Sequence, residues 1–315
     1  MELVKVIQPG EPGNPFMTPI IDPTGITRKF LDVEYTPDKP HPMRRLDIYL
    51  PETGDGPFPV LIYMHGGGFV GGMKNDFHAE NYMEALNEGF AFVSVEQRLC
   101  TPQADGTFDP EGVFPWPLFD LKAAIRFLRA NAPDYKLDSG RFALIGTSAG
   151  GYHVAMAAAT QCVPAMYDGS LGFAGVSDGI QAVIDLFGVG DLVLQSAFSD
   201  RMIKEAPEGV PAFLLQNFAD VFLGVNCQKN LNLSYFANPE KWITGDLPPM
   251  LIQAGAADQV VPVECSRMLA KRIGEVCGAG RADYDEFPDY AHGDARFHEP
   301  ANHKRIFGWL KEKLR

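Results

Sequence analysis

A serine between residues with very small side chains stands out in "RFALIGTSAGGYHVAMAAAT", where the pattern is Gly146-x-Ser148-x-Gly150. The apolar run before it predicts a buried strand, and the alanine-rich run after it predicts a helix. In that context the pattern is typical of a sharp turn that projects a serine hydroxyl from the end of a sheet, because small neighbours let strand and helix approach. We therefore expect Ser148 to be a nucleophile. The alternative, a glycine-rich turn with a passive serine, stays open.

A serine hydroxyl needs an imidazole to take its proton, and the imidazole needs a carboxylate that fixes its tautomer. Asp258 follows the predicted buried strand "PPMLIQAG", and His292 lies in a loop after the next predicted strand. The chain order Ser, Asp, His is typical of hydrolases whose serine lies on such a turn. We expect Ser148, Asp258 and His292 to form a catalytic triad.

Other acidic and histidine residues fit these positions less well. Asp246 precedes its predicted strand, and His298 and His303 lie near or within the last helix, where we expect solvated side chains. His153 is too close in sequence to fold back over Ser148, so we expect a structural role for it. Three further acids are expected on the last strand and its exit: Asp283, Asp285 and Asp289.

The segment "YMHGGGFVGG" directly follows an apolar run and is rich in glycine. Backbone N–H groups without neighbouring side chains can stabilise the oxyanion that forms when a serine attacks an acyl carbon. We expect the amides of Gly67, Gly68 and Ala149 to form this oxyanion hole and His65 to brace the loop. The alternative is that the glycines serve only a tight turn.

Four apolar residues are predicted to line the substrate pocket, because they adjoin the oxyanion loop, a helix start or a strand end: Phe69, Val70, Trp116 and Phe187. Bulky rings there would leave room only for short acyl groups. The alternative is that each is an ordinary core residue.

A mostly parallel sheet covered by helices is predicted, because five short runs are apolar almost throughout and helical patterns separate most of them. These runs are "FPVLIYM", "FAFVSVEQ", "RFALIGT", "IQAVIDLF" and "PPMLIQAG". Before them, "RKFLDVEYT" and "RRLDIYLP" predict an antiparallel pair. Two helices show apolar stripes, one through Leu118, Leu121, Ile125 and Leu128 and the other through Met268, Leu269 and Ile273.

We expect one α/β domain over residues 1–315, because no linker-like segment divides the chain. Residues 1–28 are rich in proline and predict an extended arm. About 60 residues, roughly 190–245, exceed an ordinary strand-to-helix connection and predict a cap over the site. Trp242 or Tyr235 of this cap could stack on a sugar.

Composition and charge indicate which kinds of molecule the protein is expected to bind. The chain is 46% hydrophobic and 21% charged, as expected for a globular protein, and its formal charge of -13 argues against binding to nucleic acid or an anionic membrane. The N-terminal "MELVKVIQPG" does not resemble a signal peptide and no apolar run could span a bilayer, so we expect a cytoplasmic protein. Five cysteines without a CxxC pair predict reduced, mostly packed thiols and no metal site.

From about 46 to 314 the chain resembles α/β-hydrolase esterases of the hormone-sensitive-lipase and acetyl-xylan/feruloyl-esterase type. The similarity lies in "HGGGF", "FPWPLFDLKAAIRFLRANA", "GTSAGG", "DLFGVGDL" and "GAADQVVP", which occur in the family's order. The resemblance implies hydrolysis of carboxylic esters without cofactor or metal, through an acyl-enzyme on Ser148. It carries the family's Asp to Asp258 and its His to His292. It implies structural roles for Arg98 and Asp120.

These motifs favour an esterase that removes short acyl groups, such as acetyl, from sugars or small alcohols. An amidase or arylformamidase would share the fold and the triad. A catalytically inactive α/β-hydrolase that only binds ligands is disfavoured, because it would not need a complete triad and oxyanion loop. A lipase acting at a lipid interface is not expected, since no strongly apolar amphipathic lid is present. The sequence carries no prediction of oligomeric state.

Overall fold

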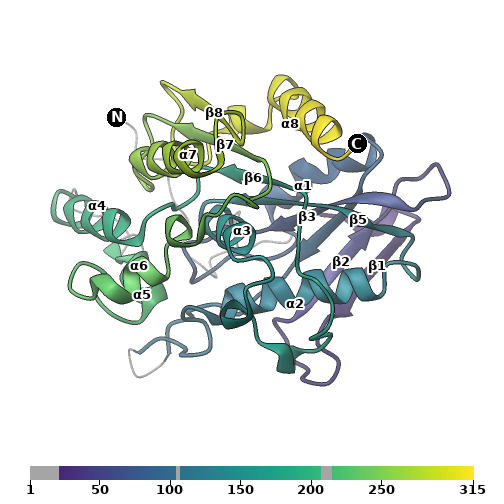
Figure 1. Cartoon of the computed structure of the whole chain (residues 1–315), viewed down its shortest axis with the longest axis horizontal. Helices are drawn as coiled ribbons and strands as arrows, with labels where there is room; N and C mark the ends of the chain where they lie inside the picture. The colour runs from purple at the N-terminus through teal and green to yellow at the C-terminus, as the bar shows by residue number, and fades with distance from the viewer. Residues whose placement is uncertain (1–20, 104–106, 207–214) are drawn as a thin grey trace.

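The computed structural model describes residues 21–103, 107–206 and 215–315, and these residues build one eight-stranded sheet (Figure 1). The strand order is β1-β2-β4-β3-β5-β6-β7-β8. β1 and β2 pair antiparallel, as predicted, β2 is antiparallel to β4, and the remaining pairs are parallel. The strands are β1 (Lys29–Glu34), β2 (Arg45–Tyr49), β3 (Phe58–Met64), β4 (Ala91–Val95), β5 (Leu137–Thr147), β6 (Ala182–Leu186), β7 (Met250–Gly255) and β8 (Ala282–Phe287).

The central strands are buried on both faces, which explains their nearly continuous apolar sequences. In β3, Val60, Ile62 and Met64 pack into the core on one side of the sheet. Leu61 and Tyr63 point to the opposite side and pack into a second core. Two hydrophobic cores therefore hold the sheet between two layers of helices.

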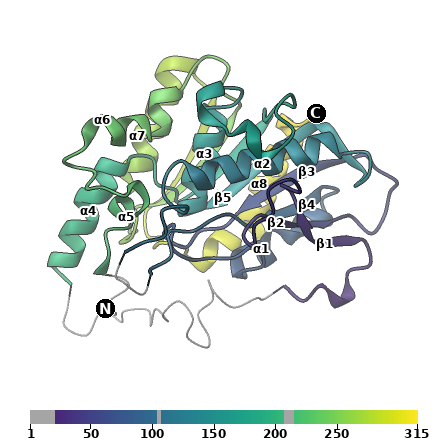
Figure 2. The same ribbon diagram turned by 90° about the horizontal axis from the view of Figure 1, so that it is seen from below.

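Helices cover both faces of the sheet (Figure 2). One layer contains α2 (Trp116–Ala130), α3 (Ala149–Ala159) and α7 (Glu264–Cys277), and the other contains α1 (Phe77–Tyr82) and α8 (Pro300–Lys313). In the described part of the chain, no helix has both the length and the apolar character that a bilayer crossing requires.

The predicted apolar stripe of α2 is confirmed, because its four residues are all buried. The stripe predicted for α7 is partly wrong. Leu269 and Ile273 are buried, but the side chain of Met268 is 44% exposed. The buried stripe of α7 runs through Cys265, Leu269 and Ile273 at four-residue spacing, and Met268 lies about 100° around the helix from Leu269.

The described residues between β6 and β7, the region of the predicted cap, contain several helices. These are α4 (Leu192–Lys204), α5 (Phe218–Leu223) and α6 (Leu231–Phe236), which Figure 1 shows near α3 and α7, and the 3-10 helix η6 (Pro239–Trp242). Whether they form a cap over the site stays a prediction. The predicted N-terminal arm lies mostly outside the described residues. Of its described part, Pro23–Gly25 form a 3-10 turn.

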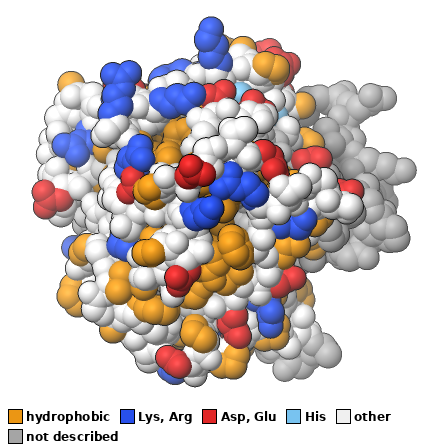
Figure 3. All heavy atoms as spheres, turned by 90° about the vertical axis from the view of Figure 1, so that its right-hand side faces the viewer, with side chains coloured by type: hydrophobic (Ala, Val, Ile, Leu, Met, Phe, Trp, Pro, Cys, Tyr) orange, Lys and Arg blue, Asp and Glu red, His pale blue; other side chains and the backbone are white. Residues whose placement is uncertain are grey.

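The edge strand β1 is irregular. Its register with β2 shifts between Phe30 and Val33, where Asp32 has a φ of +52° and donates its N–H to Asp47 Oδ1 at 2.7 Å. Figure 3 views the side of the molecule on which β1 and β2 lie in Figure 1, and hydrophobic side chains are exposed there among charged ones. A bulge in an edge strand disfavours pairing with a further strand.

All five cysteines are free thiols, as predicted. Cys100, Cys227 and Cys265 are buried, Cys277 is partly buried, and Cys162 is exposed. Burial raises the pKa of Cys265 to about 12, so this thiol is neutral at neutral pH.

The turn from β5 into α3 depends on three glycines. A Cβ at Gly146 would lie 2.8 Å from Gly151 N, and a Cβ at Gly151 would lie 2.6 Å from Gly188 Cα. A Cβ at Gly150 would lie 2.7 Å from His65 O. These distances are too short for any side chain, so the turn requires glycine for steric reasons.

Gly150→Ala should therefore destabilise the protein, because the added Cβ overlaps backbone atoms that cannot move aside. We expect a loss of about 1–3 kcal/mol in the free energy of unfolding, measured by urea denaturation. Gly308→Ala is the matched control. Gly308 is exposed within α8, a Cβ there meets no atom within 4 Å, and the change should add about 0.5–1 kcal/mol. A Gly150→Ala protein as stable as the control would contradict the close approach.

Candidate active site

Ser148 lies between the end of β5 and the start of α3, as the sequence predicts. Its φ of +55° is unusual for a residue with a side chain. The Ser148 N–H donates to Leu186 O at 2.9 Å, and the Ser148 carbonyl accepts from Tyr152 N–H at 3.3 Å. These bonds hold the turn in its strained conformation. The turn lies at the carboxyl ends of the parallel strands.

The structure brings Ser148, His292 and Asp258 together in one hydrogen-bonded chain. Ser148 Oγ lies 2.9 Å from His292 Nε2, and His292 Nδ1 lies 2.6 Å from Asp258 Oδ2. Asp258 Oδ1 accepts the N–H groups of Val260 and Val261 at 2.7 and 2.9 Å. The side chains of His292 and Asp258 are 15% and 2% exposed. The imidazole is thus aligned between a hydroxyl and a carboxylate that its own turn holds in place.

Phe187 lies behind the His292 imidazole. Its ring contacts His292 edge-on, with centroids 5.0 Å apart, and packs against Phe297 at 4.8 Å. Phe187 is buried and has a φ of +44°. This residue, which the sequence suggested as a pocket wall, supports the orientation of the imidazole.

The glycine-rich loop lies against the nucleophile turn. A Cβ at Gly66 would be 3.2 Å from Ser148 Cβ. Gly67 and Gly68 have φ values of +106° and +62°, so the loop adopts conformations that favour glycine. Among the described residues, no acceptor takes the amide N–H of Gly67 or Gly68, and Ala149 begins α3 with its N–H unpaired. The loop beside Ser148 and the start of α3 therefore carry backbone donors that are available to a ligand.

His65 is buried inside this loop and braces it. His65 Nδ1 donates to Gly66 O at 2.8 Å, and Nε2 lies 3.0 Å from Glu96 Oε1. Burial lowers the pKa of His65, but the hydrogen bond to Glu96 and the negative charge of Glu96 raise it by more. The pKa of His65 is therefore above its usual value. The expected bracing contacts of His65 are present.

A second buried network links the loop side of the site to the nucleophile turn. Tyr63 Oη donates to Asp76 Oδ1 at 3.0 Å and lies 3.3 Å from Thr147 Oγ1, the residue before the serine. Asp76 Oδ1 also accepts Ala79 N–H at the start of α1. Burial raises the pKa of Asp76 to about 6. No local sequence pattern predicts this network, because its three residues lie far apart in the chain.

Phe69 and Val70, both predicted to line the pocket, differ in burial. Phe69 is buried and stacks on Phe222 of α5, with ring centroids 4.0 Å apart, whereas Val70 is partly buried. His153 packs edge-on against Phe69, and burial together with the nearby His65 lowers its pKa to about 3. His153 is thus a neutral core residue, in keeping with its expected structural role.

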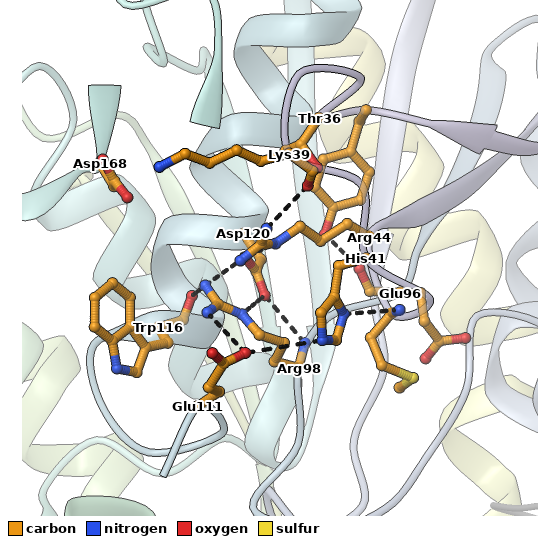
Figure 4. A network of polar contacts seen from close by, with 12 residues as sticks. Thr36, Lys39, His41, Arg44, Glu96, Arg98, Glu111, Trp116, Asp120 and Asp168 are labelled. Atoms are coloured by element: carbon orange, nitrogen blue, oxygen red, sulfur yellow. Dashed lines mark hydrogen bonds and ion pairs between the residues drawn. The ribbon is translucent and has the colours of Figure 1, made fainter. Parts of the chain in front are cut away.

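Trp116 lies next to a buried ion-pair cluster (Figure 4). Arg98 donates to both carboxylate oxygens of Asp120 at 2.8 Å, and Arg44 Nε donates to Asp120 Oδ1 at 3.0 Å. The Arg98 guanidinium lies over the Trp116 ring, 5.2 Å from its centroid. Asp120 is fully buried, so this cluster ties the segment after β4 to α2, and Arg98 and Asp120 are structural. No contact joins Trp116 to the serine within the described residues.

The alternative histidines lie elsewhere. His298 Nε2 shares a hydrogen bond of 2.9 Å with His78 Nδ1 on α1, and burial lowers the pKa of His298 to about 4. The expectation that His298 and His303 are solvated is wrong, because both are partly buried between α1 and α8. His292 is the histidine that contacts Ser148.

Trp242 is remote from Ser148. It lines a groove with Ala158 and Ala159 at the far end of α3, about 16 Å along the helix from the serine turn. Its indole N–H donates to Phe236 O at 2.8 Å. The prediction that Trp242 could stack on a substrate at the serine is therefore wrong. For metals, the described residues contain no group of three or more His, Cys, Asp or Glu side chains that could hold an ion.

A comparison with protein-family models matches residues 46–273 to BD-FAE. The chain belongs to the BD-FAE family. Esterase LipC of Mycobacterium tuberculosis is 27% identical over 257 residues, which cover 80% of this chain and 57% of LipC. The chain spans about half the length of the curated relatives it matches.

Two solved structures are similar to this BD-FAE chain over most of its length. A bifunctional GH43-CE protein of Bacteroides eggerthii has a TM-score of 0.74 at 24% identity, covering 91% of this chain and 38% of the other. A truncated carbohydrate esterase from gut microbiota has a TM-score of 0.73 at 23% identity, covering 92% and 97%. These likenesses show the fold, and the predicted α/β-hydrolase fold is confirmed.

Asp185 is a further acid that sequence analysis did not single out. It lies on β6 opposite Gly146 of β5, and its carboxyl group is buried beside the first turn of α3. A Cβ at Gly188 would lie 2.9 Å from the Asp185 Cγ. Burial raises the pKa of Asp185 to about 7, although the Gly188 N–H bond lowers it. This carboxyl is thus mostly protonated below neutral pH.

The raised pKa predicts that Asp185 lowers stability as the pH rises. Between about pH 4 and 7 the folded protein holds a proton that the unfolded chain releases, so the free energy of unfolding falls as pH rises. Asp185→Asn should match the wild type in Tm near pH 4.5 and exceed it at pH 8. The exposed Asp55→Asn is the control, with a Tm difference that does not change with pH. A pH-independent difference for Asp185→Asn would overturn this prediction.

Proposed function

We propose that the protein is a serine carboxylesterase that hydrolyses short-chain acyl esters through an acyl-enzyme on Ser148. The observation that carries this proposal is the hydrogen-bonded chain from Ser148 Oγ through His292 to Asp258. Esterase names among the relatives, LipC included, support the same reaction class.

In the proposed reaction, Ser148 Oγ attacks the acyl carbon while His292 Nε2 takes the hydroxyl proton. Negative charge then develops on the former carbonyl oxygen, and the amides of Gly67, Gly68 and Ala149 stabilise it. His292 gives the proton to the departing alcohol, which leaves the acyl group on Ser148. Water, activated by His292, releases the acid in the second half of the reaction.

Asp258 stabilises the imidazolium that forms twice in each cycle. Its Oδ2 accepts from His292 Nδ1, which fixes Nε2 as the nitrogen that faces the serine. The two N–H bonds from its own turn hold the other oxygen, so the carboxylate does not rotate. Phe187 supports the other side of the imidazole.

The proposed substrate is a small-molecule ester, and an acylated saccharide is the favoured class. Support comes from structural neighbours that are described as a carbohydrate esterase and an acetyl ester-xyloside bifunctional hydrolase. Phe69, Val70 and Trp116 remain predicted to shape the pocket, and Tyr235 remains a candidate for sugar contact. The cytoplasmic location and the single domain over 1–315 also remain predictions.

Ser148→Ala should lower kcat for p-nitrophenyl acetate by at least about 10³-fold, because no neighbouring group can replace the hydroxyl. Asp258→Asn should lower kcat by about 10⁴-fold through the wrong imidazole tautomer, as for other triads. The matched control is Ser139→Ala, an exposed serine at the start of β5, which should retain wild-type activity.

Acetylated xylo-oligosaccharides and an N-formyl aryl amide should be assayed in parallel with the same variants. The proposal expects release of acetate and no comparable turnover of the amide. Near-native activity of Ser148→Ala would contradict the serine mechanism. Faster turnover of the amide would replace the esterase with an arylformamidase.

A further inference from the structure

Phe218, the first residue of α5, touches the glycine loop beside Ser148. A Cβ at Gly68 would lie 3.1 Å from Phe218 Cδ1 and Cγ and 3.3 Å from Cε1, so the ring lies against the Gly68 Cα. Phe218 is half-buried, which leaves part of its ring accessible. No local sequence pattern predicts this contact, because Phe218 lies 150 positions after Gly68.

A second ring of α5 supports this position. Phe222, one helical turn after Phe218, stacks on Phe69 with an interplanar angle of 14°. Residues four apart lie on the same face of a helix. One face of α5 therefore packs along the loop at two successive positions, Gly68 and Phe69.

Polar contacts fix α5 to α4, so the ring cannot easily move away. Asn217 Oδ1 accepts Asp220 N–H at the helix start, and Asn217 Nδ2 donates to Ser196 O at 3.0 Å and to Asp200 Oδ1 at 2.8 Å. Ser196 Oγ also donates to Asp220 Oδ1 at 2.7 Å. The residue preceding Phe218 is thus anchored by several hydrogen bonds to the neighbouring helix.

The sheet order indicates which part of a substrate meets this ring. The order β3-β5-β6-β7-β8 puts the glycine loop after β3 on one side of Ser148, and His292 after β8 on the other. The departing alcohol must lie near His292 Nε2, because that atom protonates it. The carbonyl oxygen faces the Gly67 and Gly68 amides of this loop. The acyl substituent is then directed away from His292, into the space beside the loop that the Phe218 ring borders at Gly68.

We propose that Phe218 is a specificity-determining residue that limits the length of the acyl group accepted at Ser148. This inference rests on the proposed esterase function. An acetyl methyl ends before the ring, whereas each further methylene of a longer chain meets a volume that the ring already fills.

The test compares kcat/KM for p-nitrophenyl acetate, butyrate, hexanoate and octanoate in the wild type, Phe218→Ala and Phe218→Leu. We expect the octanoate-to-acetate ratio to rise at least tenfold in Phe218→Ala and by less in Phe218→Leu. Phe198→Ala is the matched control, since Phe198 is a half-buried phenyl group on α4 that packs with Arg201, and its ratio should equal the wild type's. The leucine variant keeps apolar bulk and serves if the alanine variant fails to fold.

A second series holds the acyl group at acetate and varies the alcohol. Phe218→Ala should leave the relative rates of this series unchanged. An unchanged octanoate-to-acetate ratio in an active Phe218→Ala or Phe218→Leu protein would overturn this inference. A change confined to the alcohol series would overturn it as well. Either outcome leaves the esterase proposal intact. If the wild type hydrolyses no ester, both proposals fall.

Discussion

Ser148 projects from the sheet because backbone segments around it approach more closely than side chains permit. Gly146, Gly150 and Gly151 place β5, α3 and the loop after β3 in direct backbone contact. This approach holds the serine at a φ of +55°, a conformation that the surrounding bonds must over-determine. The glycine loop after β3 and the His292 imidazole both lie against this one turn.

Burial sets the charges around the turn. Burial keeps His153 neutral in the core, and it raises the pKa values of Asp76 and Asp185, whose carboxyl groups lie near the turn that contains Ser148. The pKa of His65 is raised, although its burial lowers it, because Glu96 lies against the imidazole. Electrostatic interactions in such a buried setting are stronger than in water, which would favour the proposed stabilisation of an oxyanion by fixed amide donors.

The sequence predicts the parts of this arrangement that local patterns encode. Strand, turn and helix around Ser148 follow from small residues at fixed spacing, and the order of Asp258 and His292 follows from their places after predicted strands. Residues whose role depends on distant contacts were missed or misplaced. Phe218 contacts the loop only because α5 packs there. The pKa of Asp185 is raised only because its carboxyl group is buried. Trp242 lies at the end of α3 that is distant from the serine. Met268 is exposed although its spacing matches that of the buried residues of α7, so spacing alone does not determine which residues of a helix are buried.

Covalent labelling with a serine-reactive probe would show whether His292 makes Ser148 nucleophilic. The full chain is incubated with a fluorophosphonate, digested, and mapped by mass spectrometry, in the wild type and in a folded His292→Ala variant. We expect one phosphonylated peptide that contains Ser148 in the wild type and a loss of that adduct in the variant. An adduct on a different serine, or unchanged labelling of Ser148 without His292, would contradict this expectation.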